Sequence, residues 1–330
     1  MTDGQRCSSV MLSVIFVACS AGHPEDRKAP HVALPIETAS REPLRVPSGG
    51  VVLDGELLLP ASMRGKRLSL VVFVHGSGRL DRDGNGPGLR CDSYKALAFA
   101  LAEHGVASYR YDKRGAGKSQ ADLPPEARTL NRFVDDVVAV TEHLRGDPRF
   151  DRLTLLGHSE GSDVVLLAAN RAKPDAIVLA GGSGRPLVDV LRTQLAAQVD
   201  AATVASFERL VIALRAGHAL ENVPPALEPL FRPSSLPWLQ SSLDEDPSRT
   251  AREVRLPTLI VRGEFDAQVG RNDAANLASA MPHARTIEVP RANHLLKEES
   301  SLKLPQPSYE DPRYPLAKGA IDAILSGVAR

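Results

Sequence analysis

The chain is 330 residues long, with 43% hydrophobic and 24% charged residues, and its 40 basic residues equal its 40 acidic ones in number. This composition is that of an ordinary globular protein with a sizeable core, and it excludes a largely disordered chain. With a formal net charge of +0, the chain lacks the overall positive field that draws proteins to nucleic acid, so no nucleic-acid partner is expected.

A short apolar stretch, VMLSVIFVA, occupies residues 10–18, between Arg6 and Cys19. It is too short to cross a bilayer, but its length is typical of the apolar region of a secretory signal. The small residue Ala18 before Cys19 resembles the end of a bacterial lipoprotein signal, in which the cysteine becomes the acylated first residue. We therefore predict that residues 1–19 direct export and that a lipid on Cys19 anchors the chain to a bacterial membrane. The protein would then be periplasmic, with Ser20 favouring the outer membrane. The alternative is an apolar N-terminus with no part in export, in a cytoplasmic protein.

The next segment, residues 20–47, carries five prolines among charged residues and has no sustained apolar period. This pattern predicts an extended tether, or an arm packed on the domain. The dipeptide Asp54-Gly55 stands between apolar runs at 51–53 and 57–59, which predicts the two-residue turn of a β-hairpin. The folded domain is therefore expected to begin near residue 48.

Short apolar runs alternate with helical patterns along most of the remaining chain. A run that is apolar on both faces is typical of a parallel strand covered by helices on two sides. We therefore predict an α/β fold with a mostly parallel central sheet and helices on both of its faces. The predicted strands are residues 70–74, 106–111, 153–156, 176–179, 258–261 and 286–289, and the predicted helices are residues 93–104, 131–145, 160–171 and 273–280.

The interval 185–252 interrupts this alternation. It contains no strand-like run, but a long amphipathic stretch at 187–216 and then segments punctuated by prolines. A connection of this length has a structure or a function of its own. We predict a mainly helical cap, inserted between core segments 48–184 and 253–330.

The pentapeptide Gly-His-Ser-Glu-Gly at 157–161 stands between a predicted strand and a predicted helix. In this context Gly-x-Ser-x-Gly indicates a nucleophile elbow, a sharp turn that presents the serine hydroxyl above the sheet. The glycines let strand and helix approach closely, and the N–H groups at the helix N-terminus favour negative charge. Ser159 is therefore the predicted nucleophile.

A second motif, His-Gly-Ser-Gly at 75–78, follows an earlier predicted strand. When a serine attacks an acyl group, negative charge develops on the carbonyl oxygen and needs N–H donors. One donor is the residue after the nucleophile, and the other comes from this earlier loop. The predicted oxyanion-hole donors are Glu160 and Ser77, with Gly76 as the alternative in the loop. His75 is expected to hold the loop by hydrogen bonds and to take no part in proton transfer.

A third motif, Asp-Lys-Arg-Gly-Ala-Gly-Lys-Ser, occupies residues 112–119. Together the three motifs resemble the α/β-hydrolase family, and more narrowly its bacterial carboxylesterases. The resemblance extends from about residue 51 to the C-terminus and is weakest across the cap. It implies the α/β-hydrolase fold and a serine hydrolase that cleaves carboxylic esters through an acyl-enzyme, without a metal or an organic cofactor.

The chain order of this family is nucleophile, acid, histidine. After the strand predicted at 258–261, the resemblance places the acid on Asp266, with Glu264 as its rival. After the last predicted strand it places the base on His294, whereas His283 is expected at the surface. The resemblance thus implies a triad of Ser159, His294 and Asp266.

The expected substrate is a small or medium acyl ester held beneath the cap. Trp238 is the first candidate for an apolar pocket, together with Leu236, Phe231 and Phe207, although these residues may equally form the interior of the cap. The same triad also serves thioesterases, lactonases and peptidases, and the fold can serve binding alone, so these functions stay open as alternatives.

For three further sequence features no binding or catalytic role is predicted. Residues 115–119 resemble the end of a phosphate-binding loop, but Asp112 stands where that loop requires glycine. The acidic, glycine-rich stretch 81–88 lacks the spaced acidic ligands and closing glutamate of a calcium loop. Cys91, the only cysteine after residue 19, is expected to be inert.

Overall fold

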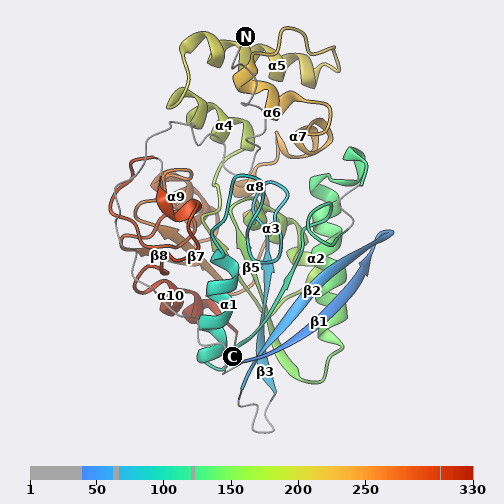
Figure 1. Ribbon diagram of the computed structural model, residues 1–330, viewed down its shortest axis with the longest axis vertical. Helices are drawn as coiled ribbons and strands as arrows, with labels where there is room; N and C mark the ends of the chain where they lie inside the picture. Colours follow the sequence, from blue (N-terminus) through green and yellow to red (C-terminus); the bar gives the residue numbers. More distant parts are fainter. Residues whose placement is uncertain (1–38, 62–66, 120–122, 305, 330) are drawn as a thin grey trace, which may run out of the picture.

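A single mixed sheet forms the centre of the protein. The computed structural model describes residues 39–61, 67–119, 123–304 and 306–329. In this part of the chain the strands are β1 (Ala39–Ser48), β2 (Val51–Pro60), β3 (Leu68–Val74), β4 (Ala107–Tyr111), β5 (Phe150–His158), β6 (Ala176–Ala180), β7 (Thr258–Gly263) and β8 (Arg285–Val289). Their order in the eight-stranded sheet is β1-β2-β4-β3-β5-β6-β7-β8 (Figure 1). The β1–β2 and β2–β4 pairs are antiparallel and the others are parallel.

Helices cover both faces of this sheet, as the continuous apolar strands predict. The helices of the core are α1 (Ser93–Glu103), α2 (Leu130–Arg145), α3 (Glu160–Ala172), α9 (Arg271–Ala280) and α10 (Ala320–Gly327). Along β3, Leu70 and Val72 belong to the apolar cluster that includes residues of α2, α3 and α9, whereas Val71 and Phe73 belong to the cluster of α1 and α10. Since alternate residues of a strand point to opposite faces, a buried strand needs apolar residues at every position. The predicted α/β-hydrolase fold class is confirmed.

The N-terminal part of the described chain differs from the prediction. Residues 39–47 were expected to belong to a tether, but they form most of β1, which pairs with β2 along its whole length. The turn between the two strands lies at Gly49 and Gly50, both with positive φ, and not at Asp54-Gly55. Gly55 lies within β2, where a Cβ would come within 2.2 Å of the Tyr109 hydroxyl, so this glycine serves a close approach and not a turn.

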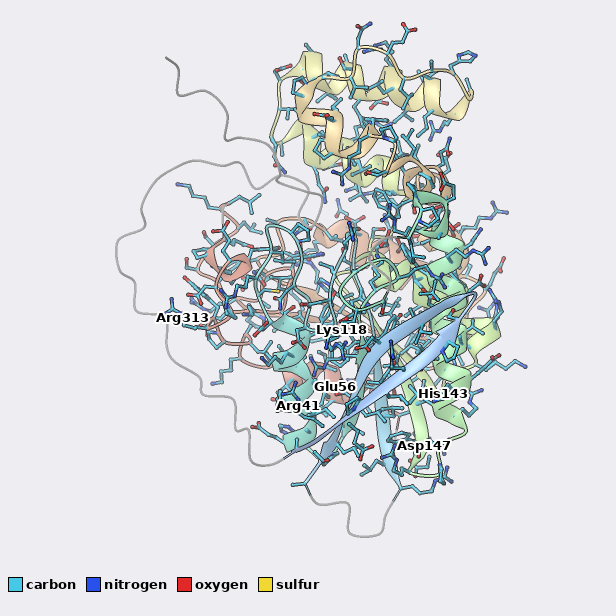
Figure 2. All side chains as sticks on the ribbon, turned by 45° about the vertical axis from the view of Figure 1, so that its right-hand side comes forward. Arg41, Glu56, Lys118, His143, Asp147 and Arg313 are labelled. Carbon is cyan, nitrogen blue, oxygen red and sulfur yellow. The ribbon has the colours of Figure 1, made fainter. Side chains whose placement is uncertain are left out.

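Strand β1 forms one edge of the sheet and carries many charged residues. Arg41 on β1 forms an ion pair with Glu56 on β2 at 2.9 Å, and Figure 2 shows these two labelled side chains beside each other on the paired strands. The predicted export signal at 1–19, the lipidation site Cys19 and the remainder of the tether at 20–38 lie outside the described residues. Among the residues that the structure does describe, no helix has the length and apolar character needed to cross a membrane.

The interval between β6 and β7 is helical. It holds α4 (Leu187–Ala196), α5 (Ala201–Arg215), α6 (Glu228–Phe231), α7 (Leu236–Ser242) and α8 (Pro247–Ala251), and its helices α4 to α7 stand at one end of the core (Figure 1). The Asp200 side chain caps α5 by accepting the Thr203 N–H at 2.8 Å. The rings of Phe207 and Phe231 are buried with their centroids 6.0 Å apart. These two aromatic residues therefore form part of the interior of the cap.

Candidate active site

The turn between β5 and α3 holds Ser159 in an unusual backbone conformation. Its φ is 55° and its ψ is −125°, which is strained for a residue with a side chain. A Cβ at Gly157 would lie 2.3 Å from the Gly161 carbonyl oxygen, and a Cβ at Gly161 would lie 2.2 Å from the Val74 carbonyl oxygen. Only glycine allows strand, turn and helix to pack this closely, and the result is the sharp elbow that the pentapeptide predicts.

The loops after β7 and β8 bring Asp266 and His294 together. His294 Nδ1 lies 2.8 Å from Asp266 Oδ2, while the N–H groups of Gln268 and Val269 donate to the other carboxylate oxygen at 2.8 and 2.9 Å. Burial raises the pKa of Asp266, but His294 and these hydrogen bonds outweigh it and hold the pKa below its ordinary value. An ionised Asp266 accepts the proton on Nδ1, which leaves Nε2 of His294 able to accept another.

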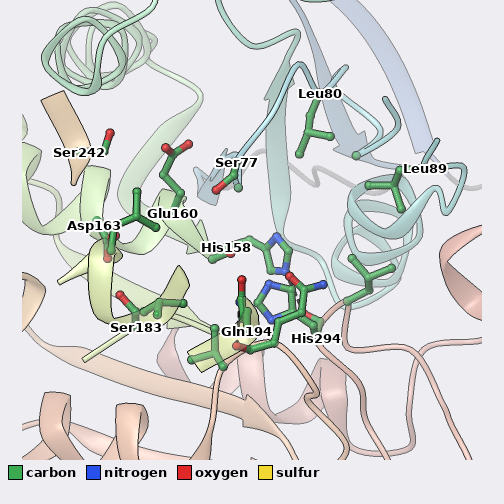
Figure 3. A pocket seen from close by; sticks show the side chains of 18 of the residues that line it. Ser77, Leu80, Leu89, His158, Glu160, Asp163, Ser183, Gln194, Ser242 and His294 are labelled. Atoms are coloured by element: carbon green, nitrogen blue, oxygen red, sulfur yellow. Dashed lines mark hydrogen bonds between the residues drawn. The ribbon is translucent and has the colours of Figure 1, made fainter. Parts of the chain in front are cut away.

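Ser159 and His294 line the same pocket, which has a volume of about 70 Å³. Its walls come from the core loops and from the cap, whose helix α4 contributes Gln194. Figure 3 shows Asp163 and Ser242 on one side of the pocket and Leu80 and Leu89 on the other, with His294 between them. The carboxyl ends of the strands and the cap therefore enclose a single small site around the serine.

The loop after β3 passes directly beside the nucleophile. A Cβ at Gly76 would lie 3.2 Å from the Cβ of Ser159. The Gly76 N–H donates to the Tyr94 hydroxyl at 3.1 Å, so this group is already engaged. Ser77 is the next residue and lines the pocket together with Glu160, the first residue of α3. The geometry therefore favours Ser77 over Gly76 as the donor from this loop.

Comparison with known proteins supports the fold. Residues 68–229 match the model of the family described as serine aminopeptidase, S33. The esterase EstD of Thermotoga maritima is 28% identical over 205 residues, which are 62% of this chain and 48% of EstD, so the match spans about half of that relative. A crystal structure of a proline iminopeptidase from Mycobacterium smegmatis has a TM-score of 0.53 at 18% identity, covering 77% of this chain and 92% of that chain. The structure of Est1E of Butyrivibrio proteoclasticus with ferulic acid bound has a TM-score of 0.52 at 19% identity, and the match covers 76% of this chain and 91% of Est1E. The chain has the α/β-hydrolase fold.

In this α/β-hydrolase, Lys113 connects the two sides of the expected oxyanion hole. Its ammonium group donates to the Gly76 carbonyl oxygen at 2.8 Å and to Glu160 Oε2 at 2.6 Å. The indole N–H of Trp238 donates to the other carboxylate oxygen of Glu160. Lys113 and Glu160 are both buried. The sequence analysis assigned no role to Lys113, although it is the second residue of the Asp-Lys-Arg-Gly motif.

Two buried histidines support the hydrolase site without a free proton-accepting role. His158 contacts the Tyr94 hydroxyl through Nδ1 at 2.8 Å and the His294 carbonyl oxygen through Nε2 at 2.9 Å. Burial, followed by the nearby His294, lowers the pKa of His158 to about 3, so the ring stays neutral. His75 also has its pKa lowered to about 3 by burial and then by Lys113.

The expectation that His75 holds its loop by hydrogen bonds stays a prediction. The backbone of Tyr111 and of Asp81 approaches the ring, but neither ring nitrogen completes a hydrogen bond of good geometry in the described structure. The ring also packs edge-on against Tyr94 and Tyr111, with centroid distances of 5.5 and 4.9 Å. Ring packing inside the core therefore fixes this residue.

Trp238 occupies a different place from the one expected. It does not line the pocket of Ser159 but a neighbouring cavity, and its ring separates that cavity from Glu160. Leu236 and Phe231 line a separate depression in the surface of the cap. The apolar cap residues singled out in the sequence are therefore not among those that line the triad pocket.

Carboxyl groups line the triad pocket of this hydrolase. Glu160, Asp163 and Glu245 do so, and among the described lining residues there is no lysine or arginine. Asp163 Oδ1 and Ser242 Oγ are buried and have no hydrogen-bond partner in the described structure. Burial, followed by the charges of Glu160 and other carboxylates, raises the pKa of Asp163 well above its ordinary value, which favours the neutral acid. No motif in the sequence marks Asp163 or Ser242.

Glu264 and His283, the alternatives to Asp266 and His294, lie away from the triad pocket, and Asp273 and Cys91 have other surroundings. Glu264 accepts the Arg291 N–H at 2.8 Å and does not line the triad pocket. His283 is exposed, after α9 and before β8. Asp273 lies in the first turn of α9 and accepts the Gly270 N–H at 3.1 Å. Cys91 is buried, and burial raises the pKa of its thiol, which disfavours the reactive thiolate.

Proposed function

We propose that this α/β-hydrolase is a serine-dependent carboxylic-ester hydrolase with the triad Ser159, His294 and Asp266. The observation that carries the proposal is the hydrogen-bonded Asp266–His294 pair, placed on the pocket that the strained Ser159 also lines. A pre-oriented histidine and a half-buried serine on one pocket are the arrangement that activates a hydroxyl nucleophile.

In the proposed reaction, His294 Nε2 takes the hydroxyl proton as Ser159 Oγ attacks the ester carbonyl carbon. The N–H groups of Glu160 and Ser77 stabilise the negative charge on the carbonyl oxygen. His294 then gives the proton to the alcohol oxygen, the bond from the acyl carbon to that oxygen breaks, and an acyl-enzyme remains. Water attacks the acyl-enzyme with the same proton transfers and releases the carboxylic acid. Asp266 orients the imidazole and stabilises its protonated form throughout.

The decisive test identifies the nucleophile and the preferred bond together. A fluorophosphonate probe should label Ser159, as mass spectrometry of the digested protein would show, and Ser159→Ala should abolish the labelling. The purified enzyme would then be assayed on matched ester, thioester, lactone and amide substrates. Labelling of another residue, or turnover of amides at rates above those of esters, would contradict an ester hydrolase.

Amide hydrolysis is the second candidate function, because the matching family is named for an aminopeptidase and Glu245, a pocket-lining carboxyl group outside the described ion pairs, is suited to an amine. Esters are favoured because EstD, an esterase, is a matching relative. Aminoacyl esters and aminoacyl amides with the same acyl part would separate the two functions, since both offer the ammonium group to the carboxyl wall.

The size of the pocket supports a preference for short acyl chains. A volume of about 70 Å³ offers room for on the order of five water-sized groups, since one water needs roughly 10–15 Å³ by this measure. Acetate and butyrate esters are therefore proposed as better substrates than long-chain esters. Equal or faster hydrolysis of emulsified long-chain triglycerides would contradict this preference.

The apolar run before Cys19 supports a further proposal on location: export, cleavage before Cys19 and acylation of that residue. Labelling of the native bacterium with a fatty-acid analogue, followed by fractionation, tests it. Cys19→Ser should block processing and release the protein from the membrane. Unchanged processing and membrane association in that variant would exclude lipidation.

A further inference from the structure

A second cavity, of about 120 Å³, lies beside the triad pocket and has the opposite electrostatic character. Five basic residues line it and no acidic residue does so in the described part of the chain: Arg79, Lys113, Arg114, Arg128 and Arg232. Two of these charges are compensated, because Lys113 pairs with Glu160 and Arg114 pairs with Asp136. The guanidinium groups of the other three residues define what we call the arginine pocket.

The charges of Arg128 and Arg232 are balanced only in part inside the described structure, by the carboxylates of Glu126 and Glu228. Neither residue takes part in an ion pair there, and Arg232 donates from Nε only to the Ser235 hydroxyl at 3.1 Å. Burial, and then the like charge of Arg79, lowers the pKa of both Arg128 and Arg232. The like charges of Arg128 and Arg232 on one cavity repel each other, and a bound anion would relieve that repulsion.

Both the core and the cap contribute to fixing these arginines. Arg79 donates from Nε to the Gly115 carbonyl oxygen at 2.9 Å. The side chain of Arg128 packs against the same glycine, where a Cβ would lie 2.7 Å from its Cδ. Arg232 follows α6 in the cap and is oriented by Ser235. Because Arg79 and Arg232 already donate from Nε to fixed acceptors, less entropy would be lost when an anion orders their guanidinium groups.

The remaining wall of the arginine pocket is apolar. Pro87, Phe133 and Trp238 line it, and the Lys113 ammonium group lies 4.2 Å from the centroid of the Phe133 ring. From these contacts we propose that the arginine pocket binds a small organic anion, a carboxylate or phosphate carried on an apolar body. Guanidinium groups bind such anions through paired N–H donors, and the apolar body would contact the Trp238 side. The Lys113–Glu160 pair and Trp238 separate this site from the triad pocket.

Calorimetric titration with phenylphosphonate at constant ionic strength tests the proposal on the full enzyme. Wild-type protein should bind one molecule per chain, and Arg128→Gln and Arg232→Gln should each weaken binding about tenfold or more, since a charge-assisted hydrogen bond is lost. Arg209→Gln is the matched control, because Arg209 is an exposed cap arginine that donates to backbone carbonyl oxygens. Circular dichroism checks that each variant is folded.

Two further comparisons distinguish specific binding at the arginine pocket from a nonspecific effect of ionic strength. Benzoate should compete with phenylphosphonate, whereas the uncharged benzyl alcohol should not. Equal affinity in wild type, Arg128→Gln and Arg232→Gln would overturn the site, as would a response that does not saturate and follows ionic strength alone. Inorganic phosphate that binds as tightly as phenylphosphonate would overturn the contribution of the apolar wall. Arg128→Lys, which keeps the charge but loses the paired donors, should give an intermediate affinity.

Discussion

Lys113→Met is expected to reduce both the stability and the activity of this hydrolase. The substitution leaves the Glu160 carboxylate buried with the Trp238 indole as its remaining side-chain donor, and it removes the link to the Gly76 carbonyl. Breaking a buried ion pair from one side costs about 3–5 kcal/mol. At about 2 °C per kcal/mol for a protein of this size, Tm should fall by about 6–10 °C.

The activity should fall by more than the loss of folded protein explains. Lys113 holds the loop of Ser77 against the start of α3, so its loss shifts the two expected N–H donors relative to each other. A displacement of this kind costs about 10- to 100-fold in kcat, less than the complete loss of a donor. Calorimetry for Tm and ester turnover at a temperature where all variants are folded measure the two effects. Lys118→Met is the control, because Lys118 is exposed and belongs to the same motif (Figure 2).

A double-mutant cycle with Glu160→Gln separates the ion pair from simple packing. Since the double variant buries no unpaired charge, it should be more stable than the sum of the single changes predicts, with a coupling of about 0.5–3 kcal/mol. An unchanged Tm in Lys113→Met, or additive effects in the cycle, would refute the view that this lysine holds the two donor segments together.

The other predictions concern the triad, the carboxyl wall and the elbow. Ser159→Ala and His294→Ala should each lower kcat/KM by about 10⁴-fold or more, and the double variant should be little worse because the residues act as a unit; a folded His294→Ala enzyme with near-normal turnover would exclude this base. The pKa of Asp163 is higher in the folded than in the unfolded state, so stability is lost as pH rises through the folded value. Asp163→Asn should therefore raise Tm at pH 8 and leave it nearly unchanged at pH 4, whereas a pH-independent difference would contradict the protonated carboxyl. Gly161→Ala places a Cβ against a backbone carbonyl and should cost about 1–3 kcal/mol of stability by denaturant unfolding, while Gly146→Ala, with a negative φ and a nearest contact of 3.5 Å, should be nearly neutral.

The sequence predicts the core of this fold well because the relevant signals are local. Gly-x-Ser-x-Gly marks the elbow at Ser159 as a contiguous motif, although only Gly157 faces a neighbour within the motif, whereas Gly161 makes room for the backbone of Val74 on another strand. The roles of Lys113 and Asp163 depend on contacts between segments far apart in the chain, and no local pattern reports such contacts. The turn predicted at Asp54-Gly55 is wrong for a similar reason. Glycine is needed at position 55 because the Tyr109 side chain on the neighbouring strand lies where a Cβ would be, and not because the chain turns there.

The position of β1 at the edge of the sheet bears on aggregation. Within the described part of the chain it is the outermost strand, and its outer backbone groups pair with no other strand there; such an edge is one to which a strand from another chain can add. Pro43 and Pro47 have the same parity along the strand, and the pairing with β2 is unbroken, so the donors that they lack belong to the open edge. The flanking Arg41 and Arg45 add charge there. The prolines that make this segment resemble a tether are the residues that allow it to end the sheet without promoting aggregation.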